Sequence, residues 1–188
     1  EGVAENSGLA LNGFGMGEGK NFTVDATQSL TYAGGITFNG FESLDILLGS
    51  GDETLAISDT GDASEKAGSE TLDAPMITTV HGGGGSDTIT VTGRGNGPLV
   101  IYGDTSEDGA QYANTGDAAS SSGTAFTNAA ADTIDASGMA DPNDGFVGVV
   151  IYGGDGDDQI TGSQGDDLIA GGQGADDIDA KGGDDLIY

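Results

Sequence analysis

Large apolar residues recur at every ninth position over the last part of the chain. Isoleucine stands at each of these positions, namely Ile160, Ile169, Ile178 and Ile187. Because neighbouring side chains of a strand point to opposite faces, the three residues centred on each isoleucine predict a short strand with only the isoleucine facing inward. Helical periodicity of useful length is nowhere evident, so the pattern predicts a protein built from strands.

Glycine-rich turns separate these short strands. The nine-residue blocks begin at Gly153, Gly162, Gly171 and Ala180 and read GGDGDDQIT, GSQGDDLIA, GGQGADDID and AKGGDDLIY. Glycine at positions one to four lets the backbone turn at positive φ and leaves carbonyl oxygens uncovered. Position six is always an aspartate: Asp158, Asp167, Asp176 and Asp185. One block is therefore predicted to be a turn followed by a strand.

Two blocks make one full coil, so turns on the same edge belong to alternate blocks. Asp158 is then expected to stack on Asp176, and Asp167 on Asp185. Successive coils lie about 4.8 Å apart, and two carboxylates at about 5 Å repel each other by about 3 kcal/mol at an effective dielectric constant of about 20. The stack is therefore not expected to form without a cation.

Calcium has the right dimensions for such a stack. It bonds oxygen at roughly 2.3 to 2.6 Å, and twice that length is close to the coil spacing, so one ion can contact oxygens of two coils. Magnesium fits worse, because it requires a tighter octahedron and gives up water reluctantly. The alternative, a flexible glycine-rich linker, does not explain an isoleucine at every ninth residue.

The blocks follow the pattern GGxGxDxUx, in which U is a large apolar residue. They resemble the RTX family, also known as repeats-in-toxin or hemolysin-type calcium-binding proteins. The resemblance implies a parallel β-roll with calcium inside its turns, in a bacterial protein that leaves the cell unfolded by type I secretion. Millimolar calcium outside the cell would saturate even sites with dissociation constants of about 10⁻⁴ to 10⁻³ M. Folding would then be switched by the compartment.

Looser copies of the block lie upstream. Residues 82–90 read GGGGSDTIT and match fully, with Asp87 at position six. Residues 48–56 read LGSGDETLA, with Glu53 in place of the aspartate. Residues 132–134 resemble the tail of another copy whose glycine turn has been lost.

Apolar triplets precede several of these turns, and we expect them to stack as strands of one parallel sheet. They are Ile46-Leu47-Leu48 before Gly49, Thr79-Val80-His81 before Gly82, Val100-Ile101-Tyr102 before Gly103, and Val150-Ile151-Tyr152 before Gly153. The spacing between these turns varies, so the excess residues are expected to loop out on an edge, as insertions in solenoids do.

The fold class predicted from these patterns is all-β, a right-handed parallel β-roll or β-solenoid with calcium-binding turns and irregular inserted loops. Residues 1–45 form an irregular β-rich N-terminal part, with strand signals at Phe22–Val24, Leu30–Tyr32, Ile36–Phe38 and from Phe41 onward. Residues 46–152 form degenerate coils with loops at about 58–74 and 109–131, and residues 153–188 form the regular roll. Since the last residue falls inside a repeat, we expect the chain to be part of a longer protein.

Charge narrows the possible partners. The 188 residues include 32 acidic and 4 basic side chains, for a formal net charge of -28, and 37 glycines. That sign disfavours nucleic acid and anionic membranes, and no apolar stretch approaches the ~20 residues of a membrane span. Such a composition is typical of disorder, so calcium is expected to drive folding. Cysteine is absent, which excludes disulfides and thiolate metal sites within this chain.

Catalytic motifs are not found. His81 is the single histidine, which excludes an HExxH zinc site, and the GxSxG elbow of serine hydrolases is absent. His81 takes the place that Tyr102 and Tyr152 hold in the sister triplets, so we interpret it as a strand residue. A pair of carboxylates as in glycosidases was weighed, but aspartates bound to calcium cannot act as acids. We therefore predict that the chain is not an enzyme.

The expected metal site is a set of turns that bind several calcium ions. Acidic residues at position five, Asp157, Asp166 and Asp184, are interpreted as solvated charge. The predicted ligands are the position-six aspartates Asp87, Asp158, Asp167, Asp176 and Asp185, then Asp108 in the looser turn GDTSED, and the turn glycines Gly82, Gly83, Gly85, Gly103, Gly153, Gly154, Gly156, Gly162, Gly165, Gly171, Gly172, Gly174 and Gly183.

Three classes of function were compared. The favoured hypothesis is a calcium-binding structural segment of a large secreted or cell-surface protein, of adhesin or surface-layer type, with self-assembly or cell-surface partners left open. The alternative is the calcium-binding secretion and folding module of a type I-secreted enzyme such as a protease or lipase. Binding of ice or another ligand on a flat sheet face would need rows of threonine or aromatic residues, and position nine shows none.

Overall fold

The architecture is described from a computed structural model. It covers residues 8–12, 21–25, 36–37, 43–48, 52–58, 60, 77–93, 97–104, 130–139 and 148–188, with side chains described from residue 43 onward. These residues contain strands and turns and no helix, and the strands form two seven-stranded sheets in which every described pairing is parallel. The predicted all-β parallel roll is confirmed.

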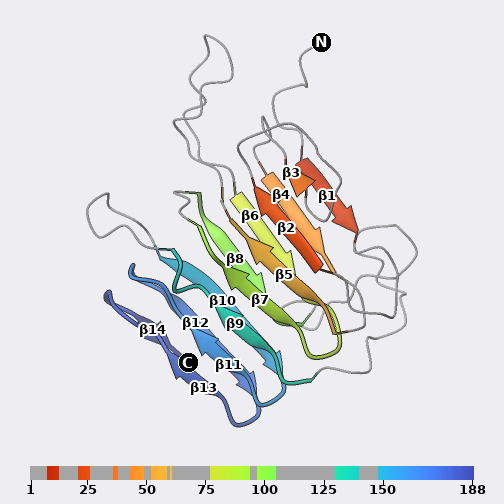
Figure 1. Cartoon of the computed structure of the whole chain (residues 1–188). Coiled ribbons are helices and arrows are strands. Elements are labelled where there is room, and N and C mark those ends of the chain that lie inside the picture. The colour runs from red at the N-terminus through yellow and green to blue at the C-terminus, as the bar shows by residue number, and fades with distance from the viewer. Residues whose placement is uncertain are drawn as a thin grey trace, which may run out of the picture.

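From residue 43 onward the strands alternate between the two sheets along the chain, as a roll requires, whereas two consecutive N-terminal strands both belong to the second sheet (Figure 1). The first sheet has the order β1 (Gly8–Asn12), β4 (Ser43–Leu47), β6 (Ile77–His81), β8 (Leu99–Tyr102), β10 (Val149–Asp155), β12 (Leu168–Gln173) and β14 (Leu186–Ile187). The second has the order β13 (Asp177–Asp179), β11 (Gln159–Thr161), β9 (Thr133–Asp135), β7 (Thr88–Val91), β5 (Thr54–Ile57), β2 (Asn21–Asp25) and β3 (Ile36–Thr37). Each coil therefore lies on the coil before it.

The C-terminal coils have the predicted regularity. Ile151 pairs with Ile169, and Ile169 pairs with Ile187 in the first sheet, while Ile160 pairs with Ile178 in the second. Equivalent residues of these coils are 18 positions apart. Each block supplies one strand, and successive blocks add their strands to the two sheets alternately. Two nonapeptides therefore make one coil.

The core is a double row of aliphatic side chains between the sheets. The residues that line it, with exposed fractions of 4% or less, are Leu44, Ile46, Val80, Ile101, Ile151 and Ile169 from the first sheet and Leu55, Ile57, Ile89, Val91, Ile134 and Ile160 from the second. Burying each such side chain contributes about 1.5–3 kcal/mol. The strand pattern of alternating buried and half-buried residues confirms that position eight faces inward.

The four apolar triplets lie in one parallel sheet, as predicted, but the first of them is shifted by one residue. Ile46 pairs with Val80, and Leu47 pairs with His81, whereas the triplet alignment places Leu48 opposite His81. The charge of Asp45 fixes this register, because Asp45 is exposed on the outer face and its neighbours must then point inward. Leu48 takes the first turn position, in agreement with the alignment that starts a nonapeptide there.

His81 is a strand residue of the first sheet, as predicted. Its ring stacks on Tyr102 with a centroid distance of 4.8 Å, and Tyr102 stacks on Tyr152 at 5.0 Å. Such stacking between neighbouring strands stabilises their register. Ala170 pairs with Tyr152 on the next strand, so the column of rings does not continue directly to Tyr188.

A short threonine row does occur on the outer face of the second sheet. Thr54 pairs with Thr88, and Thr88 pairs with Thr133. The prediction that no such row emerges considered only position nine, and these residues stand at position seven. Gln159 and Asp177 continue the row without threonine.

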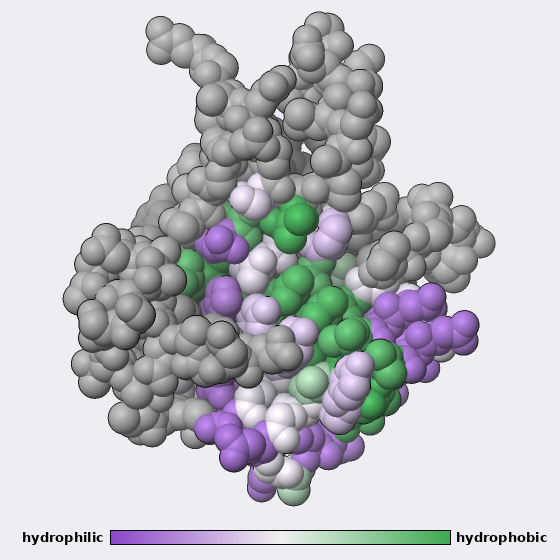
Figure 2. Space-filling model, turned by 180° about the vertical axis from the view of Figure 1, so that it is seen from behind, coloured by the Kyte–Doolittle hydropathy of each residue, from purple (hydrophilic) through white to green (hydrophobic). Residues whose placement is uncertain are grey.

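Apolar surface is also exposed. Figure 2 shows one face on which green, hydrophobic residues form a band between white and purple ones. The large apolar side chains most exposed among the described residues are Ile77, Leu186, Ile187 and Tyr188. No helix in the part of the chain described is long and apolar enough to cross a bilayer.

The N-terminal part adds strands to both sheets. The strand predicted at Phe22–Val24 lies within β2, which pairs with β5, and β1 pairs with β4, although the sequence did not indicate β1. The strand signal at 30–32 lies outside the described residues. So do the predicted loops, apart from Ser58, Thr60 and residues 130–131 at their ends.

Candidate metal site

The turns of the roll form two edges. We call the turns that lead from the first sheet to the second the first edge, and those that lead back the second edge. Five acidic residues close the turns of the first edge, and we call them the acidic column: Glu53, Asp87, Asp132, Asp158 and Asp176. Each stands directly before a strand of the second sheet, so the parallel pairing of those strands brings the five residues into register.

Hydrogen bonds join the acidic column from coil to coil. In each step, one carboxylate oxygen accepts the backbone N–H of the equivalent residue in the preceding coil. The donor–acceptor distances are 2.7 Å from Glu53 to Asp87, 2.8 Å from Asp87 to Asp132, 2.8 Å from Asp132 to Asp158 and 3.0 Å from Asp158 to Asp176. The predicted stacking of Asp158 on Asp176 is confirmed, and the same contact runs through the irregular coils.

Asp132 belongs to a coil that the sequence divides. The backbone N–H of Gly82 donates to Tyr102, and that of Gly103 donates to Tyr152, so Gly103 stands at the first turn position between Gly82 and Gly153. A Cβ added at Gly156 would collide with the backbone of Ala130, which places Ala130 at the fourth position. The turn of this copy is therefore divided in the sequence: Gly103 remains at its first position, whereas Asp104 and Ala130 stand at the second and fourth positions, where the regular blocks of this edge have glycine.

The second oxygen of several carboxylates in the acidic column has no hydrogen-bond partner. Oδ2 of Asp87, Asp132 and Asp158 is buried and unbonded, and all three side chains are at most 2% exposed. An unsatisfied buried polar atom costs about 1–3 kcal/mol, and more when it carries charge. These oxygens therefore require a ligand or a proton.

The pKa values of these carboxyls show the same requirement. Burial raises the pKa of Asp87 to about 8, against a lowering by the N–H of Glu53, and burial raises the pKa of Asp132 to about 8 in the same way. Burial also raises the pKa of Asp158 to about 6. Repulsion from neighbouring carboxylates of the acidic column raises these three pKa values further. With no cation present, Asp87 and Asp132 would hold protons at neutral pH.

Carbonyl oxygens lie beside the unbonded carboxylate oxygens. A Cβ at Gly103 would collide with both Asp132 Oδ2 and the carbonyl oxygen of Gly153, the next glycine in the column of first turn positions. A Cβ at Gly153 would collide in the same way with Asp158 Oδ2 and the carbonyl oxygen of Gly171. Only glycine leaves this space open. Each pair consists of a carboxylate oxygen and a carbonyl oxygen from two successive coils. Calcium prefers oxygen donors of these two kinds.

The remaining donors would be backbone atoms. Among the described residues, no group of three or more acidic or histidine side chains is arranged to hold a metal. The oxygens of the first edge therefore fit calcium through one carboxylate per coil together with turn carbonyls. The turn glycines of the first edge that have positive φ are Gly83, Gly85, Gly154, Gly156, Gly172 and Gly174, and Gly183 of the second edge shares this conformation.

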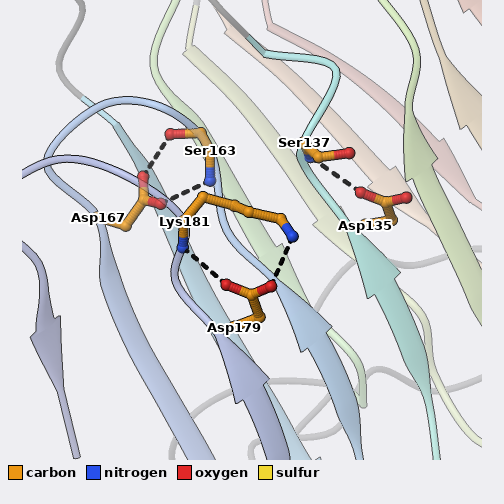
Figure 3. A network of polar contacts seen from close by, with 6 residues as sticks. All are labelled: Asp135, Ser137, Ser163, Asp167, Asp179 and Lys181. Carbon is orange, nitrogen blue, oxygen red and sulfur yellow. Dashed lines mark hydrogen bonds and ion pairs between the residues drawn. The ribbon is translucent and has the colours of Figure 1, made fainter.

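The second edge has a different arrangement. Asp167 N–H donates to Asp185 Oδ1 over 3.0 Å, which confirms the predicted stacking of this pair. However, Asp167 accepts hydrogen bonds from the backbone N–H and the hydroxyl of Ser163, both at 2.6 Å (Figure 3), and from the N–H of Val149 at 2.7 Å. Ser163 replaces the second glycine of the block. Both oxygens of Asp167 are thus already satisfied within the protein.

Position-five aspartates are exposed, as predicted, but some of them also join the coils. Asp157 Oδ1 accepts the backbone N–H of Ala175 at 2.8 Å, and Asp166 Oδ1 accepts that of Asp184 at 2.8 Å. One of these hydrogen bonds lies on each edge of the roll, beside the position-six residues. Nearby, Lys181 pairs with Asp179 at 2.5 Å (Figure 3) on the exposed surface.

Sequence reasoning missed two members of the acidic column as candidate ligands and a third acidic residue beside it. Glu53 and Asp132 were assigned to degenerate copies and left out of the site, and Asp104, at the second turn position of the divided coil, was not considered. The signals were present, in the Leu at position eight after Glu53 and the Thr-Ile pair after Asp132. Asp108, which was considered, lies outside the described residues.

The fold and these turns define a parallel β-roll with stacked oxygen sites between its coils. Residues 78–96 and 152–187 match the RTX calcium-binding nonapeptide repeat, in four copies. The chain thus carries RTX repeats, which are structural calcium-binding repeats typical of secreted proteins. Neither the curated proteins nor the solved structures contain a significant match to the chain.

Proposed function

We propose that this chain is a calcium-dependent structural segment of a large secreted or cell-surface bacterial protein, of adhesin or surface-layer type, that folds when it meets extracellular calcium. The observation that carries the proposal is the row of buried aspartates Asp87, Asp132 and Asp158, each with one oxygen unbonded. Their position between coils makes an ion part of the fold and leaves no role for it in catalysis.

Electrostatics gives calcium its effect on folding. The chain has a formal net charge of -28, so a compact form without cations must bring many carboxylates together. An ion between two coils replaces the repulsion of stacked carboxylates by attraction to both. Because the site does not exist in the unfolded chain, its binding free energy adds directly to folding.

The proposed ligands divide between the two edges. On the first edge they are the oxygens of Asp87, Asp158 and Asp176 with the carbonyls of the neighbouring turn glycines. On the second edge they are Asp167 and Asp185 with Gly162, Gly165 and Gly183. We place the stronger sites on the first edge, since Ser163 already satisfies Asp167.

The structural role is favoured over the runner-up, a secretion and folding module attached to an exported enzyme, by the irregular coils. Equivalent residues are 34 and 45 positions apart in the upstream coils, against 18 in the regular ones. Insertions of that size present additional surface from one scaffold, as suits a surface protein. We retain the division into residues 1–45, 46–152 and 153–188 as part of this proposal.

Calcium titration of the purified chain tests the function. Circular dichroism and limited proteolysis are expected to show an unfolded, protease-sensitive chain in EDTA at neutral pH and a β-rich, resistant one in millimolar calcium. Magnesium at the same concentration is expected to have little effect. A chain that is equally ordered after exhaustive removal of calcium would exclude the proposal. A protease or lipase domain in the full-length gene would favour the runner-up.

A further inference from the structure

The divided coil has an acidic residue that the nonapeptide pattern does not provide. Asp104 follows Gly103 at the second turn position, where the regular blocks have Gly154 and Gly172. A Cβ at Gly154 would collide with the side chain of Asp104, and the carbonyl of Asp104 accepts the N–H of Gly83, so the three second positions are stacked. Asp104 therefore brings a carboxylate to a place where the regular coils have only backbone.

The two oxygens of Asp104 have different surroundings. Oδ2 accepts the backbone N–H of Asp155 at 2.6 Å, which fixes the side chain against the following coil. Oδ1 is buried and has no hydrogen-bond partner. The carboxylate is close enough to Asp132 and Asp158 for its charge to contribute to the raised pKa of both residues. A Cβ at Gly103, the residue before Asp104, would collide with Oδ2 of Asp132. Asp104 and Asp132 therefore belong to the same turn, and each has one buried, unbonded oxygen.

Asp132 provides the independent indication of a ligand. It is 2% exposed, and its Oδ2 is buried without a partner beside the carbonyl oxygen of Gly153. Lys181, the one lysine or arginine in the part of the chain that the structure describes, pairs with Asp179 instead. A divalent cation would satisfy the free oxygens of Asp104 and Asp132 together with this carbonyl, and hard oxygen donors of this kind suit calcium.

We propose that Asp104 and Asp132, from the two sides of the inserted segment, complete a calcium site that joins the divided coil to the coil of Asp158. This inference rests on the proposed function. It adds a site outside the matched repeats at 78–96 and 152–187, with a ligand, Asp104, at a position where the pattern has glycine. The site lies at Asp132, the member of the acidic column between the two matched regions.

The additional carboxylate sets this site apart in affinity. Calcium sites are tuned over several orders of magnitude by the number of charged ligands and by rigidity. A site with Asp104 and Asp132 has more negative charge than a site with one carboxylate per coil, so it is expected to fill first. Through Asp104 and Asp132 it also ties together the two sides of the insertion, which offsets the entropy of closing that segment.

Calorimetric titration of calcium into Asp104→Asn and Asp132→Asn tests the site, with Asp157→Asn as the control. Asp157 is exposed, and the asparagine keeps the oxygen that accepts the N–H of Ala175. We expect both site variants to lose the tightest binding event, either as one ion fewer or as a roughly tenfold weaker affinity. The control is expected to keep the wild-type isotherm.

The outcomes separate this inference from the function it rests on. A wild-type chain that binds no calcium would overturn both. A wild-type chain that binds calcium, with Asp104→Asn indistinguishable from Asp157→Asn, would overturn the divided site alone. If circular dichroism shows that Asp132→Asn does not fold in calcium, the titration of Asp104→Asn tests the site. That variant is expected to fold, because Asp104 is only half-buried and asparagine keeps an oxygen that can accept the N–H of Asp155.

Discussion

Asp132 and Asp158 lie 26 residues apart in the chain, and the backbone N–H of Asp132 donates to Oδ1 of Asp158 over 2.8 Å. The same contact joins Asp158 to Asp176 at a separation of 18 residues, where no insertion intervenes. The irregular and the regular coils are therefore built on one rule. Each aspartate of the acidic column contacts the coil before it through Oδ1, and Oδ2 of Asp87, Asp132 and Asp158 is buried without a hydrogen-bond partner.

The two edges are expected to respond differently to loss of a carboxylate charge. Asp158→Asn removes charge from an aspartate with an unbonded oxygen, so the calcium concentration at the folding midpoint should rise by roughly tenfold. Asp167→Asn should give a smaller rise, because Ser163 and Val149 already donate to that carboxylate. Circular dichroism against calcium concentration measures both. An equal or larger rise for Asp167→Asn would contradict the assignment of the stronger sites to the first edge.

Acid is expected to replace calcium in part. The pKa values of Asp87 and Asp132 are raised to about 8 and that of Asp158 to about 6, from 3.8. Because the pKa values of these three aspartates are higher in the folded form, the folded chain binds more protons than the unfolded chain. The contribution of the three residues to the stability of the fold is therefore complete below pH 3.8 and is lost as the pH rises through 6 to 8. In EDTA, the chain should therefore be more ordered at about pH 5 than at about pH 8.

The opposite pH dependence is expected when calcium is present, because protons and calcium compete for the same carboxylates. The apparent affinity for calcium should fall as the pH is lowered from about 8 to about 5. Calorimetry at several pH values, with proton release measured in buffers of different ionisation enthalpy, checks this. An apparent calcium affinity that does not change between about pH 8 and about pH 5 would contradict ligation by these carboxylates.

Alanine at Gly103 is expected to destabilise the roll through a steric clash. Its Cβ would collide with Asp132 Oδ2 and the carbonyl oxygen of Gly153, at a cost of about 1–3 kcal/mol in the free energy of unfolding. Gly182→Ala is the matched control, since its Cβ would approach only the side-chain oxygen of Gln164, at 3.3 Å. Denaturant unfolding in saturating calcium compares the two. Similar values for both variants would contradict the packing described for Gly103.

Core substitutions should have unequal costs along the roll. Ile151 and Ile187 stand at equivalent positions of the first sheet, but Ile151 is 0% exposed and Ile187 is 50% exposed. Ile151→Ala is expected to cost about 2–5 kcal/mol, because it removes a buried side chain and leaves a cavity. Ile187→Ala should cost about 1 kcal/mol or less. Thermal unfolding in calcium measures the difference, and equal losses would place Ile187 in a closed core.

The regular coils could be predicted residue by residue from the sequence. A strict repeat of glycine turn, aspartate and isoleucine leaves one register that places every isoleucine on the inner face, so the stacking of Asp158 on Asp176 follows directly. The triplet before Gly49 was less well determined, because Ile46, Leu47 and Leu48 are all apolar. There the position of Asp45 decides which face points inward.

The divided coil and the second edge could not be predicted in the same way. Gly103 and Asp132 look unrelated in the sequence, because the insertion at 105–129 separates a turn from its own strand, and only pairing with neighbouring coils joins them. Ser163 stands at the second position of its block, where Gly154 and Gly172 stand in two other blocks. Its effect on Asp167 depends on hydroxyl and N–H directions that a pattern does not contain.

The direction of the contacts in the acidic column gives the roll a polarity. Since the carboxylate of each coil caps the N–H of its predecessor, a coil is complete only once its successor is in place. Ordering is cheapest where equivalent residues are closest in sequence, which is at the C-terminal coils. We therefore expect folding to nucleate at the C-terminal coils and to propagate coil by coil toward lower residue numbers.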